Sequence, residues 1–216
     1  MAGKYLKRKI NNIAKSVKKI PYSIRRFYNK KRIKSRDFTV ISNNCWAGKL
    51  YQYLDMPYLS PTVGLYFYAD DYMKFIKNLR HYIALDLKFI SVEESKHKEL
   101  IHQRGYFDIP VAELDDIEVI FLHYKTNEEA EEKWTRRKQR INWNHLIFKF
   151  SDMNGCTEEH LRDFSELPFP HKFILSERRP VKYDCEYFWK AKNNEDYVLF
   201  DTIPFPSNLN LSRIIK

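Results

Sequence analysis

The hydrophobic and polar positions of this chain change period from one segment to the next. Short apolar runs bounded by turn-forming residues predict buried strands, at residues 38–41, 87–92, 117–122, 146–150 and 172–175. Apolar residues three and four positions apart predict helices between these runs, at residues 46–54 and 71–83 and after Asn127 and Thr157. Strands that alternate with helices are typical of an α/β fold with a largely parallel sheet.

Local signals indicate where several of these elements begin or end. Asp70 or Asp71 is expected to cap the helix over residues 71–83, because a short carboxylate accepts hydrogen bonds from helix N–H groups. Asn127 and Thr157, whose side-chain oxygens accept hydrogen bonds in the same way, are expected to cap the helices that follow them. Residues 103–112 indicate an extended segment at a sheet edge, since a proline within it has no N–H for a ladder.

The helix expected after Asn127 is strongly polarised. Its first turn is acidic and its end is basic, which complements the helix dipole. Arg136 and Arg140 lie one turn apart on a shared face and Arg137 lies beside them. Three guanidinium groups suit a phosphate, a pyrophosphate or a carboxylate, and solvated cations at a helix end would give the same pattern.

The first 36 residues form a basic arm with a pattern of its own. They contain 14 Lys or Arg and no Asp or Glu. Apolar residues spaced alternately by four and three predict an amphipathic helix, at positions Leu6, Ile10, Ile13, Val17, Ile20, Ile24 and Phe27. Pro21 is expected to divide it into two shorter helices, because an interior proline costs about 3 kcal/mol. Such an arm fits an anionic membrane surface or a partner helix, with a solvated tail as the alternative.

Composition places the rest of the chain in one domain. A chain of 216 residues that is 44% hydrophobic and 16% aromatic can bury one sizeable core. We therefore expect the basic arm at residues 1–36 and a single α/β domain at residues 37–216. The net charge of +10 comes from the arm, since the remaining 24 basic and 28 acidic residues give −4. Nucleic acid is disfavoured as a partner, because the domain itself is acidic.

Cysteine usage and hydropathy indicate the compartment. Cys45, Cys156 and Cys185 show no C-x-x-C spacing and follow no recognisable secretory signal, which favours a reducing environment. No apolar segment approaches the roughly 18 residues needed to cross a bilayer. A cytoplasmic location is expected, with the arm able to hold the protein on the inner face of the membrane.

Candidate chemistry follows three of the predicted strands. Cys45 comes after strand 38–41, His123 after strand 117–122 and Asp152 after strand 146–150. If these strands are parallel neighbours, the three side chains share the carboxyl edge of the sheet, where open α/β sheets bind ligands. They would supply a nucleophile, a base and an orienting carboxylate. The structural alternatives are a buried thiol, a histidine bonded within the core and a turn aspartate.

The turn that carries Cys45 adds polar groups to this edge. Ser42, Asn43 and Asn44 precede the thiol and are candidates for contacting substrate, and the two amides could donate to a developing oxyanion. The sequence does not identify a cofactor, since neither G-x-G-x-x-G nor G-x-x-x-x-G-K-[ST] occurs. A metal site is also not predicted, because His97 and His102 are five positions apart and flanked by lysines.

Several motifs in order resemble one known family. They are Ile41-Ser42-Asn43-Asn44-Cys45-Trp46, Ser60-Pro61-Thr62-Val63-Gly64-Leu65, Asp71-Tyr72 with Phe75, Phe121-Leu122-His123-Tyr124, and Glu129-Ala130 with Lys133-Trp134-x-Arg136-Arg137-x-x-Arg140-Ile141-Asn142. From about residue 38 onward the chain resembles an uncharacterised bacterial family whose members are usually described as exopolysaccharide or capsular polysaccharide biosynthesis proteins. The resemblance implies a Rossmann-like, three-layer α/β/α domain and adds Ser60 and Trp134 to the candidate substrate-binding residues.

The leading functional hypothesis is a transferase of surface polysaccharide biosynthesis that acts on a sugar or lipid-linked sugar. In its most concrete form Cys45 carries an acyl group, His123 is the base, Asp152 orients it, and the arginines hold a phosphorylated or nucleotide-linked donor. One alternative is a nucleotide-sugar glycosyltransferase in which Cys45 is structural. The other is a noncatalytic binding or scaffold protein of the glycan assembly machinery.

Overall fold

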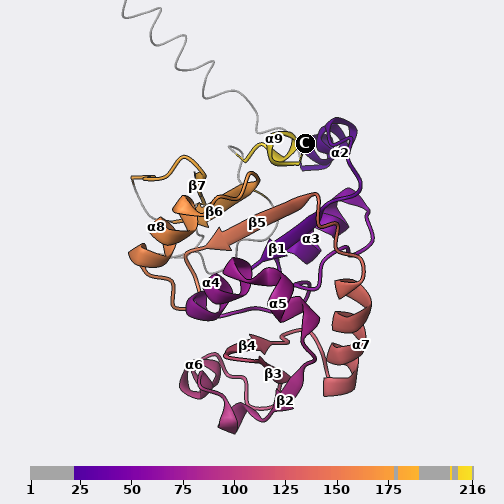
Figure 1. Ribbon diagram of the computed structural model, residues 1–216. Coiled ribbons are helices and arrows are strands. Elements are labelled where there is room, and N and C mark those ends of the chain that lie inside the picture. Colours follow the sequence, from indigo (N-terminus) through magenta and orange to yellow (C-terminus); the bar gives the residue numbers. More distant parts are fainter. Residues whose placement is uncertain (1–21, 178–179, 190–204, 206–208, 216) are drawn as a thin grey trace, which may run out of the picture.

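The computed structural model describes residues 22–177, 180–189, 205 and 209–215 and contains two β-sheets (Figure 1). The larger sheet is parallel and has the order β1-β5-β6-β7, formed by Thr39–Ser42, Leu146–Ser151, Lys172–Ser176 and Glu186–Phe188. The smaller sheet is antiparallel, with the order β2-β3-β4, formed by Lys88–Ile90, Val111–Leu114 and Ile117–Ile120. The predicted α/β class with a parallel sheet is confirmed, and the second sheet was not predicted.

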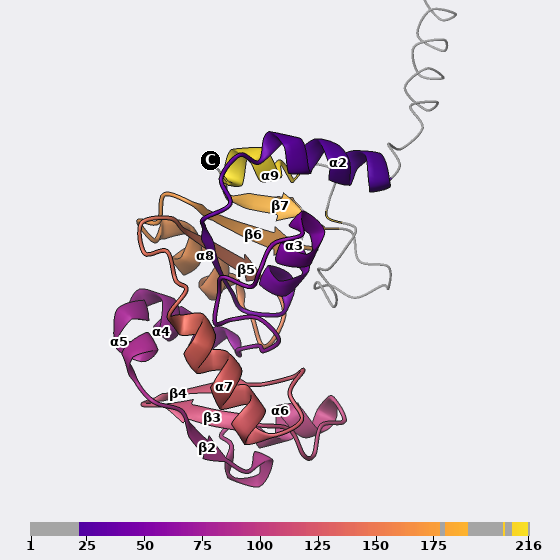
Figure 2. The same ribbon diagram turned by 90° about the vertical axis from the view of Figure 1, so that its right-hand side faces the viewer.

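Helices cover both faces of the parallel sheet, as Figures 1 and 2 show. Alternate residues of a strand point to opposite faces. Val40 and Ile147 therefore pack with α3 (Trp46–Leu54) and α9 (Leu211–Ile214) in one apolar cluster. Their neighbours Ile41 and Phe148 pack in a second cluster, with side chains of α4 (Ala69–Lys77), α7 (Asn127–Lys138) and α8 (Glu158–Glu166). The remaining described helices are α2 (Tyr22–Arg32), α5 (Leu79–Ala84), η1 (Val92–Glu94) and α6 (Lys98–Gln103).

The run at residues 117–122 forms strand β4, which was expected in the parallel sheet and lies in the antiparallel one. It pairs with β3 through a two-residue turn in which Asp115 has φ of 56°. Aspartate tolerates this left-handed conformation, so the turn closes a hairpin that the apolar pattern did not indicate. The prediction of an edge segment at residues 103–112 was also wrong, because β3 is the central strand and Pro110 lies just before it.

Helix boundaries agree with the predictions more closely than sheet membership does. Helix α3 spans residues 46–54 as expected, and Thr157 caps α8 by accepting the His160 N–H at 3.4 Å. The expected helix at 71–83 is divided at Asn78 into α4 and α5, and Tyr68 occupies the N-cap position of α4. Helix α7 begins at Asn127, but Thr126 is its cap and accepts the Glu129 N–H at 3.2 Å.

The basic arm enters the described structure after Pro21, where helix α2 begins. Arg26 Nε donates to the carbonyl oxygen of Tyr53 at 2.8 Å, and Arg25 donates to that of Phe205 at 2.8 Å. Ile33, just beyond α2, is buried in the cluster that includes α3. The second half of the arm thus packs on the domain, whereas its first half, residues 1–21, lies outside the described residues. Across the part of the chain that the structure describes, no helix is both long and apolar enough to span a bilayer.

Candidate functional site

Four segments that are distant in sequence enclose a cavity of about 300 Å³. They are the first two turns of α3, the loop at residues 58–64, the pair His123-Tyr124 after β4, and one face of α7. The lining residues are Cys45, Gly48, Lys49, Gln52, Tyr58, Val63, Gly64, His123, Tyr124, Glu129, Lys133 and Arg137. Cys45 and His123 therefore share one pocket, as the sequence led us to expect.

Cys45 occupies the N-cap position of α3 and is half-buried. The turn before it is closed by Asn44, whose Oδ1 accepts the Trp46 N–H at 3.1 Å, and by Ser42, whose Oγ donates to the Asn44 carbonyl oxygen at 2.6 Å. The thiol donates to the Leu65 carbonyl oxygen with a sulfur–oxygen distance of 3.7 Å. The thiol therefore lies at the N-terminal end of α3, where the helix dipole favours negative charge.

The segment 64–67 lies between the Cys45 turn and His123 and bonds to both. On one side the Phe67 N–H donates to the Asn43 carbonyl oxygen at 3.0 Å. On the other side the His123 N–H donates to the Gly64 carbonyl oxygen at 3.0 Å, and Tyr66 pairs with Ile120 of β4. This connection places His123 in the same pocket as Cys45 even though β4 does not belong to the parallel sheet.

The imidazole of His123 titrates below its usual range. Partial burial lowers its pKa, and the nearby charge of Lys49 lowers it further. Both effects disfavour the imidazolium, so the ring is neutral at pH 7 and able to accept a proton.

Arg137 is fixed at the wall of the pocket and is only 6% exposed. Its Nη1 donates to the Val63 carbonyl oxygen at 2.9 Å and to the Tyr124 hydroxyl, and its guanidinium lies 4.9 Å from the centre of the Tyr58 ring. Burial raises the pKa of Tyr124, so its hydroxyl stays protonated, and that hydroxyl donates to the Val63 carbonyl oxygen. A guanidinium held in this way is preorganised for a ligand.

Gly64 makes this arrangement possible. Its φ is +83°, and a Cβ there would lie 2.9 Å from the Tyr124 hydroxyl oxygen. Only glycine fits both the left-handed backbone and the contact with the ring.

The charged groups that line the pocket are mostly positive. Lys49, Lys133 and Arg137 are cations, and Glu129 is the one carboxylate among the lining residues. The Glu129 carboxylate also accepts the Lys125 N–H at 3.1 Å. The balance of charge favours an anionic ligand, such as a phosphate ester or a diphosphate.

Beneath the Cys45 turn lies a buried polar cluster that centres on Lys149 of β5. The Lys149 ammonium donates to Ser151 Oγ at 2.8 Å, to Asn44 Oδ1 at 3.0 Å and to Asn43 Oδ1 at 3.4 Å. The side-chain amides of both asparagines also donate to Ser151. Ser42, Asn43 and Asn44 thus serve the turn itself and do not line the pocket.

Asp152 lies at the carboxyl end of β5 but is not among the pocket residues. Its carboxylate accepts the Glu177 N–H at 3.0 Å, between β5 and β6, and it is almost fully buried. The structure therefore brings together Cys45 and His123 of the expected triad and places Asp152 elsewhere on the sheet edge.

The other candidate substrate-binding residues also lie partly inside and partly outside the pocket lining. Arg136 pairs with Glu132 at 3.4 Å and Arg140 donates to the Tyr58 carbonyl oxygen at 3.2 Å, both outside the pocket lining. Trp134 is buried in the core, and Ser60 is buried with its Oγ 3.0 Å from the Thr62 hydroxyl. Only Arg137 of the three arginines reaches the pocket.

Two signals in the sequence point to residues that were not predicted. Glu129 and Lys133 lie eight and four positions before the predicted Arg137, which places them on the same face of α7. Lys149 interrupts the apolar run of β5, and a charge within a buried strand requires polar partners.

Comparison with known proteins shows the family to which this chain belongs. A family model described as "Domain of unknown function (DUF1919)" matches residues 16–208, a range that contains every pocket residue. The chain is also similar to a protein of Haemophilus influenzae described as "Uncharacterized protein", with 29% identity over 168 residues, covering 78% of this chain and 75% of the relative. This chain therefore belongs to the DUF1919 family.

Proposed function

We propose that this protein is a transferase of surface polysaccharide biosynthesis that acts on an anionic, phosphorylated ligand between α3 and α7. One observation carries the proposal: a thiol at a helix N-terminus, a neutral imidazole and a fixed guanidinium line the same cavity. The motif resemblance supports the place in surface glycan assembly. Helices on both faces of the parallel sheet support a Rossmann-like domain as the scaffold.

Arg137, Lys49 and Lys133 are the groups that would hold the ligand. Arg137 uses one nitrogen for its protein contacts with Val63 and Tyr124, which leaves further N–H donors of its planar guanidinium for two phosphate oxygens. Lys49 and Lys133 add charge from the two flanking helices. A phosphorylated or nucleotide-linked sugar has the matching chemistry.

In the acyl-transfer form of the proposal, His123 takes the proton of the Cys45 thiol, and the thiolate attacks the carbonyl carbon of an acyl donor. The bond to the donor's leaving group breaks as His123 returns the proton to that group, leaving a thioester on Cys45. A sugar hydroxyl then gives its proton to His123 and attacks the thioester. The C–S bond breaks and His123 returns the proton to the Cys45 sulfur, so the products are the acylated sugar and the regenerated thiol.

A second candidate is glycosyl transfer from a nucleotide sugar. The cationic lining of the pocket favours it, and so does the contact between the Cys45 thiol and the Leu65 carbonyl oxygen, which suits a structural thiol. In this form the cations hold the diphosphate and no thioester forms.

Two substitutions in a strain that lacks the chromosomal copy distinguish the candidates. Acyl transfer predicts that Cys45→Ala and Arg137→Ala both abolish the glycan modification and that an acyl-thioester probe labels wild type at Cys45, as detected by mass spectrometry. Glycosyl transfer predicts that Arg137→Ala alone abolishes it. Cys156→Ala is the matched thiol control, and full function of both pocket variants would contradict either form of the proposal.

A further inference from the structure

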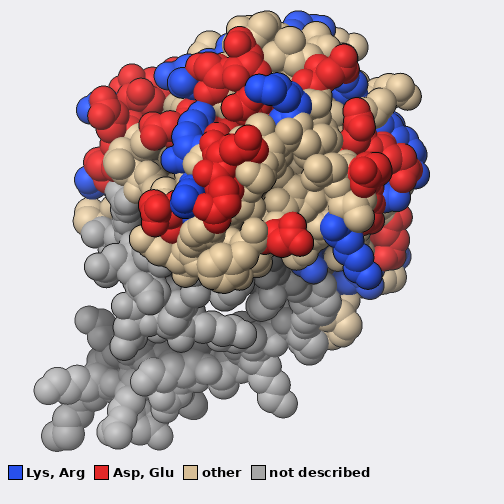
Figure 3. Space-filling model, turned by 90° about the horizontal axis from the view of Figure 1, so that it is seen from below, with Lys and Arg blue, Asp and Glu red and all other residues tan. Residues whose placement is uncertain are grey.

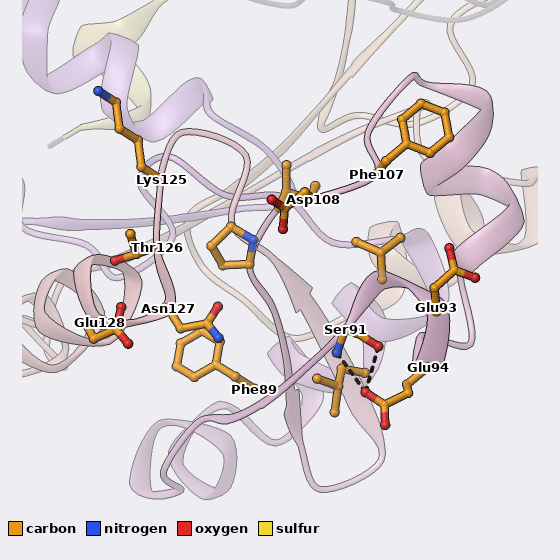
Figure 4. Close-up of a pocket in the computed structure, with 14 residues that line it drawn as sticks. Phe89, Ser91, Glu93, Glu94, Phe107, Asp108, Lys125, Thr126, Asn127 and Glu128 are labelled. Carbon is orange, nitrogen blue, oxygen red and sulfur yellow. Dashed lines mark hydrogen bonds between the residues drawn. The ribbon is translucent and has the colours of Figure 1, made fainter.

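A second and larger cavity of about 530 Å³ lies on the antiparallel-sheet part of the molecule, between the end of β2 and the start of α7 (Figure 4). It does not share a lining residue with the Cys45 pocket. Apolar side chains contribute to its lining, at Phe89, Ile90, Val92, Phe107, Ile109 and Pro110. Phe107 is 68% exposed, which is unusual for a side chain of this size.

The charged residues around this groove are mostly acidic. Glu93, Glu94, Asp108 and Glu128 line it together with one cation, Lys125. The Glu94 carboxylate is turned back to cap Ser91, at 2.9 Å from its N–H, and Glu93 pairs with Lys98 at 2.7 Å. Figure 4 shows Asp108 and Glu128 at the groove, and Figure 3 shows acidic side chains, with basic ones among them, around uncharged surface on this side of the molecule.

The chain itself contains a segment of complementary chemistry. Residues 1–21 carry seven Lys or Arg and no acidic residue. Their apolar stripe from Leu6 to Ile20 would extend about 21 Å as a helix, at about 1.5 Å per residue. An amphipathic helix with a basic face matches a groove lined by both apolar side chains and carboxylates, which is a common mode of peptide recognition.

We propose that this groove binds residues 1–21 of a second copy of the chain. Helix α2, which continues these residues, packs beside α9 at the end of the molecule opposite the groove (Figure 2). That placement favours docking onto a neighbouring molecule over docking onto the same one. Two reciprocal contacts give a symmetric dimer in which each arm strengthens the other by raising its effective concentration.

Sedimentation of the full-length chain over a range of concentrations tests the proposal. Wild type is expected to form a dimer that weakens with salt, because the contact is electrostatic in part. Asp108→Lys with Glu128→Lys is expected to raise the dimer dissociation constant about tenfold or more, and Lys7→Glu with Lys15→Glu to do the same. Glu159→Lys with Asp184→Lys is the control, since it makes the same charge change at exposed sites away from the groove.

A charge swap distinguishes loss of the dimer contact from loss of folding. The chain that carries all four groove and arm substitutions is expected to recover the dimer, because each altered arm again meets a groove of opposite charge. A monomeric wild type, or a charge-swapped chain that stays monomeric, overturns the proposal. If wild type is monomeric and its arm binds phosphatidylglycerol vesicles, the arm's partner is a membrane surface and the groove has another role.

Discussion

The ammonium of Lys149 lies 3.0 Å from Asn44 Oδ1, and the same oxygen accepts the Trp46 N–H at 3.1 Å. The fully buried Lys149 of β5 thus orders the turn between the neighbouring strand β1 and helix α3. Because Cys45 lies between Asn44 and Trp46, the position of its thiol depends on this ammonium.

Replacing Lys149 with Met is expected to destabilise the protein by about 2–4 kcal/mol. Methionine nearly preserves the volume but leaves the buried oxygens of Asn44 and Ser151 without this donor. Urea denaturation measures the loss. Lys77→Met is the control, because Lys77 is half-exposed and lies 3.9 Å from Asp163; an equal effect of both substitutions would contradict the role given to Lys149.

Replacing Gly64 with Ala is expected to destabilise the protein and to distort the pocket. The new Cβ would meet the Tyr124 ring, which is held by Arg137. Gly105 is a matched control, since its φ of +79° is similar but nothing lies within 4 Å of its Cβ position. The loss of unfolding free energy for Gly64→Ala should exceed that for Gly105→Ala by about 1–3 kcal/mol. Equal losses would show that only backbone strain matters.

Removing the charge of Lys49 is expected to raise the pKa of His123 toward its ordinary value of 6.5. NMR titration of the His123 ring in Lys49→Met measures this shift. Lys125→Met is the control, because Lys125 is near in sequence but does not contribute to the lowered pKa. If the two variants shift the pKa equally, Lys49 has no specific influence on the ring.

The same lowered pKa fixes the sign of a pH effect on stability. The unfolded chain binds the His123 proton at a higher pH than the folded chain does, so stability falls as the pH drops through 6.5 toward the folded value. His123→Gln is expected to reduce this part of the pH dependence. Denaturation curves at pH 7.5 and below 6 measure it, and an unchanged slope would contradict the prediction.

Asp71 is expected to contribute far more to stability than its neighbour Asp70. The Asp71 side chain is 2% exposed and bonds to Lys96 Nζ and His97 Nε2, each at 2.6 Å, and to the Glu118 N–H at 3.2 Å. Its removal leaves these donors without their acceptor, so Asp71→Ala should cost about 3 kcal/mol. Asp70 is 80% exposed, and Asp70→Ala should cost less than about 1 kcal/mol. Thermal unfolding of the two variants provides the comparison.

The sequence was most informative where structure is set locally. The helix at residues 46–54 and the strands β5 and β6 follow from apolar period and turn residues, which act over a few positions. The partner of β4 could not be predicted, because an apolar strand has the same pattern in either sheet. The joint location of Cys45 and His123 was expected, but the connection through Gly64 depends on contacts across 59 positions of the chain, from Gly64 to His123. Arg137 could have been distinguished from Arg136 by its spacing of four from Lys133.

The segment 64–67 couples ligand binding in the Cys45 pocket to the stability of the junction between the two sheets. It bonds to the turn after β1 on one side and to β4 and His123 on the other, so a ligand that contacts both sides adds a further tie across the same junction. Binding energy that ties two parts together also opposes their local separation. Amide hydrogen exchange at Tyr66 and Ile120 should therefore slow in proportion to ligand occupancy, which makes these two amides reporters for identifying the substrate from a set of candidate compounds.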